Sequence, residues 1–343
     1  MSHAELLSTI DAMLIPGKGI LAADESTPTI GKRFATINTE STEASRQAYR
    51  ELLFTTPDAE EHINGVILFE ETLGQSTQSG TPFPELLASK GMVPGIKVDK
   101  GVKSLPFSDG EKYTQGLDGL GDRLQAYKAQ GARFAKWRAV INISDVFPTR
   151  AAIVANAEGL ANYAAICQAN GIVPIVEPEL LMDGTHTQER CREATEAVLQ
   201  AVFETLYAHN IFLEGMILKP SMVISGSTCK AQADVTTVAE ETLKILRRTV
   251  PAAVPSINFL SGGQSDEVAT AHLNAMNASD TAKPWTLSFS YGRALQAATL
   301  KAWAGKVENV PAAQQAFYKR ARLNGLACLG QYDAAMESEA ATA

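Results

Sequence analysis

The stretch Gly171-Ile-Val-Pro-Ile-Val-Glu-Pro-Glu179 is an apolar run that ends in two acidic residues, two positions apart. The stretch Phe134-Ala-Lys-Trp-Arg138 ends in two basic residues with the same spacing. Parallel strands covered on both faces are almost wholly apolar, so charges at their ends are unusual. Side chains alternate between faces along a strand, so the two charges of each pair point the same way. Both stretches are therefore predicted to be buried strands whose last inward side chains are charged.

A short apolar strand followed by a helical pattern recurs along the chain. Eight such strands alternating with helices predict an α/β fold with a parallel sheet. Eight is also the number that closes into a (β/α)8 TIM barrel with outer helices. An open doubly wound sheet is the alternative, with less support because neither G-x-G-x-x-G after an early strand nor G-x-x-x-x-G-K-[ST] occurs. The predicted strands are Gly19–Ser26, Gly65–Glu71, Pro94–Asp99, Ala132–Val140, Gly171–Glu179, Leu213–Lys219, Ser256–Ser261 and Trp285–Ser290.

The length and composition fit one large domain. The chain has 343 residues, of which 45% are apolar, and single α/β barrels run to about 250 residues and beyond. There are 30 Lys and Arg against 38 Asp and Glu, and this net charge of −8 argues against a general nucleic-acid or membrane-surface binder. No composition shift marks a boundary, so residues 1–343 are predicted to form a single barrel domain, with residues 333–343 as a short C-terminal tail.

The sequence also predicts a cytoplasmic protein without a metal centre. The first residues lack the features of a signal peptide, and no apolar run approaches the roughly 18 residues that span a bilayer. The four cysteines have no paired spacing, which fits reduced thiols. The five histidines show no metal-ligand spacing and are predicted to be ordinary surface side chains.

The charged strand ends predict an active site, because catalytic groups of such barrels come from several strands at the C-terminal face. The alternative is that these charged side chains simply lie in solvent at the strand ends, and for a single pair this is the better interpretation. Recurrence on several strands favours a site, because charges buried without partners are costly and are kept only where they are paired or used. The set contains four acids and five bases: Asp24, Asp99, Glu177, Glu179, Lys97, Lys136, Arg138, Lys219 and Arg293.

Lys219 is the most informative of these residues. It follows Met216-Ile-Leu218 and precedes Pro220, and it has no carboxylate within four residues along the chain. A lysine against apolar walls loses solvation, which favours the neutral amine, a nucleophile towards carbonyl carbons. A lysine that extends its ammonium into water is the alternative.

Two glycine segments follow the last two predicted strands, at Ser261–Ser265 and Ser290–Arg293. Small residues let backbone N–H groups approach an anion, and barrels often bind phosphate after strands seven and eight. Ordinary tight turns are the alternative. Both segments in these places, with Arg293 beside them, favour a phosphate site.

With these residues in hand, the chain resembles the class I fructose-1,6-bisphosphate aldolases. The resemblance extends over roughly residues 10–330 and is carried by segments in family order: GKGILAADEST (Gly17–Thr27), GVILFEETL (Gly65–Leu73), GIKVDKG (Gly95–Gly101), QGLDGL (Gln115–Leu120), FAKWR (Phe134–Arg138), GIVPIVEPE (Gly171–Glu179), LEGMILKP (Leu213–Pro220), FLSGGQS (Phe259–Ser265) and FSYGRALQ (Phe289–Gln296).

The resemblance implies a lyase of glycolysis and gluconeogenesis that cleaves fructose 1,6-bisphosphate reversibly to dihydroxyacetone phosphate and glyceraldehyde 3-phosphate. It implies that Lys219 forms a Schiff base and that no metal or other cofactor is needed. Glu177 then corresponds to the general acid/base, and Glu179 orients the lysines. Lys136 sets the charge around Lys219, and Asp24 handles the proton of the C4 hydroxyl.

The remaining implied residues bind the phosphorylated sugar. Arg138 helps hold the substrate, Ser261, Gly262, Gly292 and Arg293 match the site of the phosphate nearest the ketone, and Ser26 and Lys97 match residues that bind the other phosphate. Thr29, preceded by Pro28, stands where animal members have a serine, and the phosphate contact is expected to survive with altered geometry.

Three further points follow from the resemblance. A homotetramer is implied by family analogy, whereas the absence of nucleic-acid and membrane partners is predicted from the acidic net charge. The chain lacks the C-terminal tyrosine of many eukaryotic members, since its last tyrosine is Tyr332. A transaldolase-like Schiff-base enzyme and a catalytically silent binding protein on the same fold remain alternatives.

Overall fold

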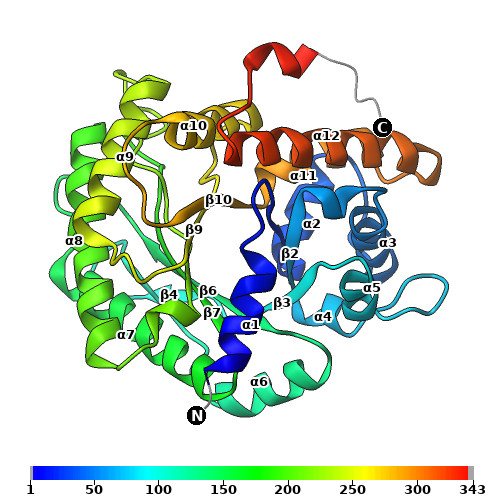
Figure 1. Cartoon of the computed structure of the whole chain (residues 1–343), viewed down its shortest axis with the longest axis horizontal. Helices are drawn as coiled ribbons and strands as arrows, with labels where there is room; N and C mark the ends of the chain where they lie inside the picture. The colour runs from blue at the N-terminus through cyan, green and yellow to red at the C-terminus, as the bar shows by residue number, and fades with distance from the viewer. Residues whose placement is uncertain (1–2, 339–343) are drawn as a thin grey trace.

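The computed structural model describes residues 3–338. Within that range eight parallel strands close into a barrel, each paired with its neighbours in chain order, and helices surround it (Figure 1). The prediction of a (β/α)8 barrel is confirmed. The barrel strands are β1 (Gly19–Ala23), β2 (Ile63–Leu68), β3 (Val93–Lys97), β6 (Phe134–Ile141), β7 (Val173–Leu180), β8 (Ile217–Leu218), β9 (Ser256–Phe259) and β10 (Thr286–Tyr291).

The other elements lie between and after these strands. A short antiparallel hairpin joins β4 (Val102–Ser104) to β5 (Lys112–Thr114). The α-helices are α1 (Ala4–Met13), α2 (Thr27–Ala35), α3 (Glu43–Phe54), α4 (Glu70–Leu73), α5 (Phe83–Ser89), α6 (Leu120–Ala129), α7 (Arg150–Ala169), α8 (Gln188–Ala208), α9 (Val235–Thr249), α10 (Asp266–Ala278), α11 (Arg293–Trp303) and α12 (Val310–Cys328). The 3-10 helices are η1 (Ala59–Glu61), η2 (Leu213–Gly215), η3 (Val307–Asn309) and η4 (Ala334–Ser338). None of the helices within residues 3–338 is long and apolar enough to cross a bilayer.

Inward-facing side chains change from apolar to charged along the barrel strands. In β6, Phe134 belongs to the apolar cluster inside the barrel, and Lys136 is the next residue on the same face. Trp137 on the opposite face is fully buried against the helix layer, where its ring stacks on Tyr163 of α7 with centroids 5.5 Å apart. Strand alternation therefore sends the charges inward, as the sequence predicts.

The N-terminal end of the barrel is closed by α1, which lies across its centre in Figure 1. Leu6, Ile10 and Met13 of α1 are buried in the same cluster as Phe134 of β6 and Ile20 of β1. Because apolar side chains fill this end, the polar space of the barrel is confined to the opposite end.

Strand lengths differ from the predictions at several ends. β2 stops at Leu68, and Glu70 and Glu71 belong to the short helix α4. β8 pairs only at Ile217 and Leu218, because its first predicted residues form η2. The hairpin of β4 and β5 was not predicted, because strands of three residues carry almost no periodicity.

The buried face of α10 also differs from the predicted one. In the sequence, Val268, Ala271, His272, Ala275 and Met276 recur at intervals of three and four, which predicts one inward stripe. His272 and Met276 are buried as this pattern predicts, but Val268 is 42% exposed and the two alanines are only partly buried. Ala269 and Leu273 complete the buried face. The alanine-rich pattern allows both assignments, and packing selects one of them.

The C-terminal segment is anchored where the structure describes it. Glu337 of η4 forms an ion pair at 2.6 Å with the buried Arg320 of α12, and the Tyr332 hydroxyl donates to Glu337 at 3.0 Å. Met336 packs against the core. Of the tail predicted over residues 333–343, residues 339–343 lie outside the described range, and the single-domain assignment over 1–343 stays a prediction.

Gly95 of β3 provides a test of the packing inside the barrel. A Cβ added there would overlap the Phe134 ring, so we expect Gly95→Ala to lower the free energy of unfolding by about 1–3 kcal/mol through overpacking. Gly159→Ala is the control, because Gly159 lies within α7 with open space at its Cβ, and a gain of up to about 1 kcal/mol is expected there. Urea denaturation measures both, and a neutral Gly95 variant would contradict the packing.

Candidate active site

A cavity of about 810 Å³ opens at the C-terminal ends of the barrel strands. Of the residues predicted for the site, all except Asp99 line this cavity, although they come from elements spread over most of the chain. They are Asp24, Ser26, Thr29, Lys97, Lys136, Arg138, Glu177, Glu179, Lys219, Ser261, Gly262, Gly292 and Arg293.

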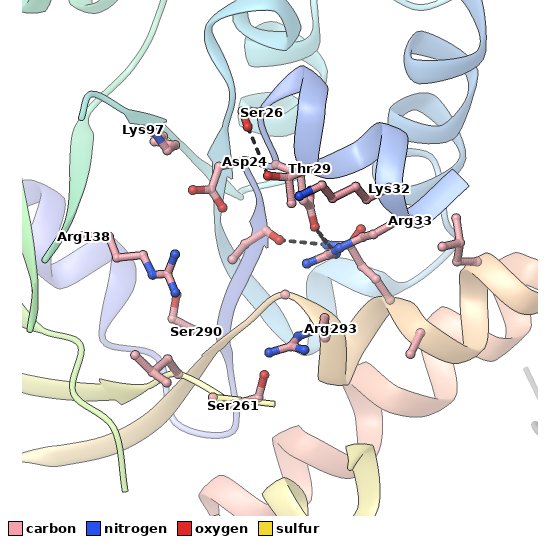
Figure 2. A pocket seen from close by; sticks show the side chains of 18 of the residues that line it. Asp24, Ser26, Thr29, Lys32, Arg33, Lys97, Arg138, Ser261, Ser290 and Arg293 are labelled. Atoms are coloured by element: carbon pink, nitrogen blue, oxygen red, sulfur yellow. Dashed lines mark hydrogen bonds and ion pairs between the residues drawn. The ribbon is translucent and has the colours of Figure 1, made fainter. Parts of the chain in front are cut away.

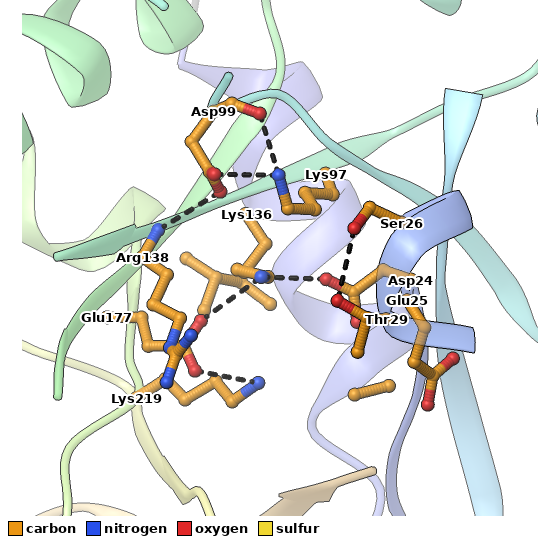
Figure 3. Close-up of polar contacts among 12 residues, drawn as sticks. Asp24, Glu25, Ser26, Thr29, Lys97, Asp99, Lys136, Arg138, Glu177 and Lys219 are labelled. Carbon is orange, nitrogen blue, oxygen red and sulfur yellow. Dashed lines mark hydrogen bonds and ion pairs between the residues drawn. The ribbon is translucent and has the colours of Figure 1, made fainter. Parts of the chain in front are cut away.

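Four charged groups form a buried chain of alternating sign in the cavity (Figure 3). The Lys136 ammonium lies 2.7 Å from Asp24 Oδ2 and 3.4 Å from Glu177 Oε2. The Lys219 ammonium lies 3.2 Å from the other oxygen of Glu177. Lys136, Glu177 and Lys219 are each 3% exposed, so these pairs replace water as the partners of the charges.

The electrostatics of the chain fix two protonation states. Burial alone would raise the pKa of Asp24, but the cations of Lys136, Lys219 and Lys97 outweigh it and hold that pKa well below its usual range. Burial alone would lower the pKa of Lys136, but the carboxylates of Asp24 and Glu177 outweigh it and raise that pKa well above its usual range. Asp24 is therefore a carboxylate and Lys136 an ammonium throughout the neutral range.

One expectation about Lys219 was incomplete. No carboxylate lies within four residues of Lys219 along the chain, but the fold brings Glu177 of the adjacent strand β7 next to it. Lys219 is thus paired with a carboxylate at 3.2 Å, whereas the sequence argument placed it against apolar walls alone. The proton of Lys219 thus has an acceptor already in place.

Two further ion pairs flank the chain. The Lys97 ammonium lies 2.6 Å from Asp99 Oδ1, as the shared face of these residues predicts. The Arg138 Nε donates to Glu179 Oε2. Burial alone would lower the pKa of Arg138, but the carboxylates of Glu179, Glu177 and Asp99 outweigh it and raise that pKa. The ion pair of Glu179 is thus with Arg138, whereas the resemblance implied that Glu179 orients the lysines.

Groups suited to binding anions lie at two sides of the cavity. In the view of Figure 2, Ser261 and Arg293 lie on one side, and Ser26, Thr29 and Lys97 lie on the other. The hydroxyls of Ser26 and Thr29 are 3.1 Å apart, so Thr29 presents its oxygen beside that of Ser26. Among residues 3–338, Arg293 makes no ion pair, which leaves its guanidinium available to an anion.

The cavity also has a polar wall that the sequence analysis missed. Glu25 is 8% exposed and forms ion pairs with Arg33 and, at 2.7 Å, with Arg50, while Gln296 donates to it at 3.0 Å. Asp24 and Glu25 follow the end of β1, and their side chains point in different directions in Figure 3. A buried carboxylate needs buried cations, and that requirement was the overlooked signal.

Two histidines correct the expectation of surface side chains. His186 and His272 are 6% and 5% exposed. His186 lies in the loop before α8 and His272 lies within α10, and burial of a histidine is not evident from residue type alone. Within residues 3–338, no group of three or more His, Cys, Asp or Glu side chains is arranged to hold a metal ion.

Comparison with known proteins agrees with this geometry. The family model described as "Fructose-bisphosphate aldolase class-I" matches residues 5–343. The chain belongs to the class I fructose-bisphosphate aldolase family. It is accordingly a carbon–carbon lyase that carries out the glycolytic retro-aldol cleavage of fructose 1,6-bisphosphate.

Individual members of the aldolase family are similar over nearly their whole length. Fructose-bisphosphate aldolase 5, cytosolic, of Arabidopsis thaliana is 58% identical and covers 98% of this chain and 94% of its own. A probable fructose-bisphosphate aldolase class 1 of Xanthomonas axonopodis pv. citri is 55% identical, with coverages of 97% and 99%. The structure of the Plasmodium falciparum aldolase in complex with TRAP and a small-molecule inhibitor superposes with a TM-score of 0.94 at 50% identity, covering 96% of this chain and 95% of that chain.

The depressed pKa of Asp24 in this aldolase predicts how its contribution to stability depends on pH. A carboxyl group whose folded pKa is lowered stabilises the fold above its unfolded pKa, here 3.8, and this stability is lost as the pH falls through the folded value. We therefore expect the free energy of unfolding of Asp24→Asn to lie below that of the parent by the same margin at every pH between 5 and 8, because in this range Asp24 is ionised in both the folded and the unfolded state. The margin narrows only below a pH of about 3.8.

Urea denaturation at a series of pH values measures this margin. Asp280→Asn is the control, since Asp280 is exposed and the substitution is expected to leave stability unchanged within about 0.5 kcal/mol. A margin for Asp24→Asn that closes between pH 7 and pH 5 would show that the neighbouring cations do not hold Asp24 ionised.

Proposed function

We propose that the aldol cleavage proceeds through a Schiff base between Lys219 and the substrate ketone, without a metal ion. The observation that carries the proposal is the position of Lys219. Its ammonium is buried in the cavity, and its one ion pair among the described residues is with Glu177 at 3.2 Å. Transfer of a proton to that carboxylate leaves the neutral amine that attack on a carbonyl requires.

The other two lysines of the cavity are poorer nucleophiles. Lys136 lies between two carboxylates, which raise its pKa and keep it an ammonium. Lys97 donates to both the side chain and the backbone carbonyl of Asp99, at 2.6 and 2.7 Å. Lys136 therefore serves as a fixed positive charge, and Lys97 as a cation suited to a phosphate.

The neighbouring groups account for the proton transfers. The Lys219 amine adds to the ketone carbon, and Glu177 donates a proton to the departing hydroxyl, so that water leaves and a protonated imine forms. Asp24 accepts the proton of the C4 hydroxyl while the C3–C4 bond breaks and its electron pair moves into the imine as an enamine. Protonation of the enamine and hydrolysis of the imine return the free lysine.

The two anion-binding sides suit the two phosphates of the substrate. We assign the phosphate nearest the ketone to Ser261, Gly262, Gly292 and Arg293, and the other to Ser26, Thr29 and Lys97. Arg138 helps hold the sugar between them, and Glu179 fixes the direction of the Arg138 guanidinium through their ion pair. The hydroxyl of Thr29 replaces the serine of animal members without loss of a donor.

We further propose a cytoplasmic homotetramer that binds neither nucleic acid nor membranes. Support for the compartment comes from relatives that are named cytosolic, and support for the assembly comes from family analogy. The net charge of −8 agrees with the absence of polyanionic partners. Sedimentation equilibrium of the full chain tests the assembly state.

We expect Lys219 to be the residue that carries the covalent adduct. Borohydride reduction in the presence of dihydroxyacetone phosphate, followed by peptide mass analysis, should label Lys219 in the parent enzyme. Lys219→Ala should lose both the adduct and lyase activity. Lys136→Ala should slow turnover by a factor of about 10²–10⁴, typical of lost electrostatic or acid–base assistance, and leave Lys219 the labelled residue.

The same preparations are treated with a chelator before the assay. Activity restored only by a divalent ion would contradict the metal-free mechanism. An adduct on Lys136 or Lys97 with Lys219 unmodified would overturn the assignment of the nucleophile.

We expect Arg293→Ala to weaken phosphate binding selectively. Loss of a charge-assisted hydrogen bond should raise KM for fructose 1,6-bisphosphate about 10- to 100-fold while cleavage of unphosphorylated fructose is unchanged. Lys306→Ala is the control for net charge, because Lys306 is an exposed cation that does not line the cavity. Equal effects of Arg293→Ala on both sugars would show that Arg293 does not bind phosphate.

A further inference from the structure

The loop between β9 and α10 carries part of the proposed phosphate site. Ser261 and Gly262 line the cavity, and Gly262 and Gly263 adopt φ angles of 57° and 88°, which are accessible to glycine without strain. A loop with two such residues has many alternative conformations. Contacts made by other residues must therefore hold Ser261 and Gly262 in the orientation that faces the cavity.

Gln264 ties this loop together from within. Its backbone N–H and its side-chain Nε2 both donate to the carbonyl oxygen of Ser261, each at 3.0 Å. A carbonyl oxygen can only accept, so the amide of Gln264 must turn its NH2 group towards Ser261. Its Oε1 then points the other way, towards α10, and needs a donor of its own.

His272 of α10 supplies that donor. Its Nδ1 lies 2.6 Å from Gln264 Oε1, and the orientation of the amide requires that Nδ1 carry the hydrogen. Burial lowers the pKa of His272 to about 4, so the ring is neutral at working pH and holds this tautomer. The hydrogen bonds therefore run in one direction, from His272 to Gln264 and from Gln264 to Ser261.

The helix that carries His272 is itself fixed from the outer layer. Arg320 of α12 donates to the backbone carbonyl of Asp266 at 3.0 Å, at the first residue of α10. The same guanidinium is held by Glu337 of the C-terminal segment. The N-terminal turn of α10 is thus anchored independently of the loop, and His272 one and a half turns further on is a fixed reference point.

We propose that Gln264 and His272 are positioning residues for the ketone-side phosphate of the substrate. They set the conformation of the loop so that the Ser261 hydroxyl and the Gly262 backbone face the phosphoryl oxygens. The inference rests on the proposed function, because it takes Ser261 and Gly262 as phosphate ligands. Neither Gln264 nor His272 touches the reacting atoms, so their effect falls on substrate binding and not on bond cleavage.

The test compares three variants. His272→Leu removes the donor to Gln264, and Gln264→Leu removes the link to Ser261. His272→Asn places an amide NH2 close to where the imidazole Nδ1 stood and should restore the link. We expect KM for fructose 1,6-bisphosphate to rise about five- to tenfold in both leucine variants, because each loses one hydrogen bond that orders the loop. We expect kcat to stay within about threefold of the parent value. His272→Asn should stay within about twofold of the parent in both parameters.

A second substrate identifies which phosphate is affected. Fructose 1-phosphate carries only the phosphate nearest the ketone, so its KM should rise by the same factor as that of the bisphosphate. A rise confined to the bisphosphate, an unchanged KM in both leucine variants, or a failure of His272→Asn to restore binding would overturn the proposal. Thermal unfolding accompanies the kinetics, and because Gln264 is only partly buried, its variant stays informative if His272→Leu does not fold.

Borohydride trapping with saturating dihydroxyacetone phosphate separates this inference from the proposed function. An adduct on Lys219 in variants whose KM is unchanged rejects the positioning role and leaves the Schiff base intact. An adduct elsewhere in the parent enzyme rejects the proposed function, whatever the KM values of the variants.

Discussion

The structure of the cavity depends on one constraint: four charged side chains that are largely removed from water at one end of the barrel must neutralise one another. Asp24, Lys136, Glu177 and Lys219 alternate in sign, and no two of them come from the same strand. Only a closed parallel barrel in this register brings their four strand ends together. Loss of Lys136 would leave Asp24, and loss of Glu177 would leave Lys219, without an ion-pair partner among residues 3–338, and an unpaired buried charge is among the most destabilising changes in a protein interior. Fold and chemistry are therefore coupled through the same side chains.

The charged side chains of the cavity differ in whether they already have an ion-pair partner within the protein. Lys136 is held by two carboxylates, and Arg138 and Lys97 each have one. Arg293, at the start of α11, lies beside a glycine turn instead of a carboxylate. Charges with ion-pair partners hold a fixed geometry, whereas a guanidinium without such a partner can exchange water for phosphate oxygens. The cavity thus combines a rigid reaction centre with groups that are free to bind a ligand.

The sequence predicts this site well where a side chain follows strand alternation, and poorly where it depends on contacts across strands. Lys136 and Glu177 could be placed because an inward charge at a strand end has one direction. The contact between Lys219 and Glu177 could not, because separation along the chain says nothing about register between neighbouring strands. Glu25 and His272 were missed because burial of a polar residue depends on partners supplied by distant helices.

The packing of α1 against the inner cluster has a consequence for the order of events during turnover. Because one end of the barrel is filled with apolar side chains, substrate and both products share a single opening. In the proposed mechanism, a three-carbon fragment tethered to Lys219 stays inside while the aldehyde diffuses out past it. Covalent attachment would thereby impose an ordered release, with the tethered half screened from bulk solvent until it is protonated and hydrolysed.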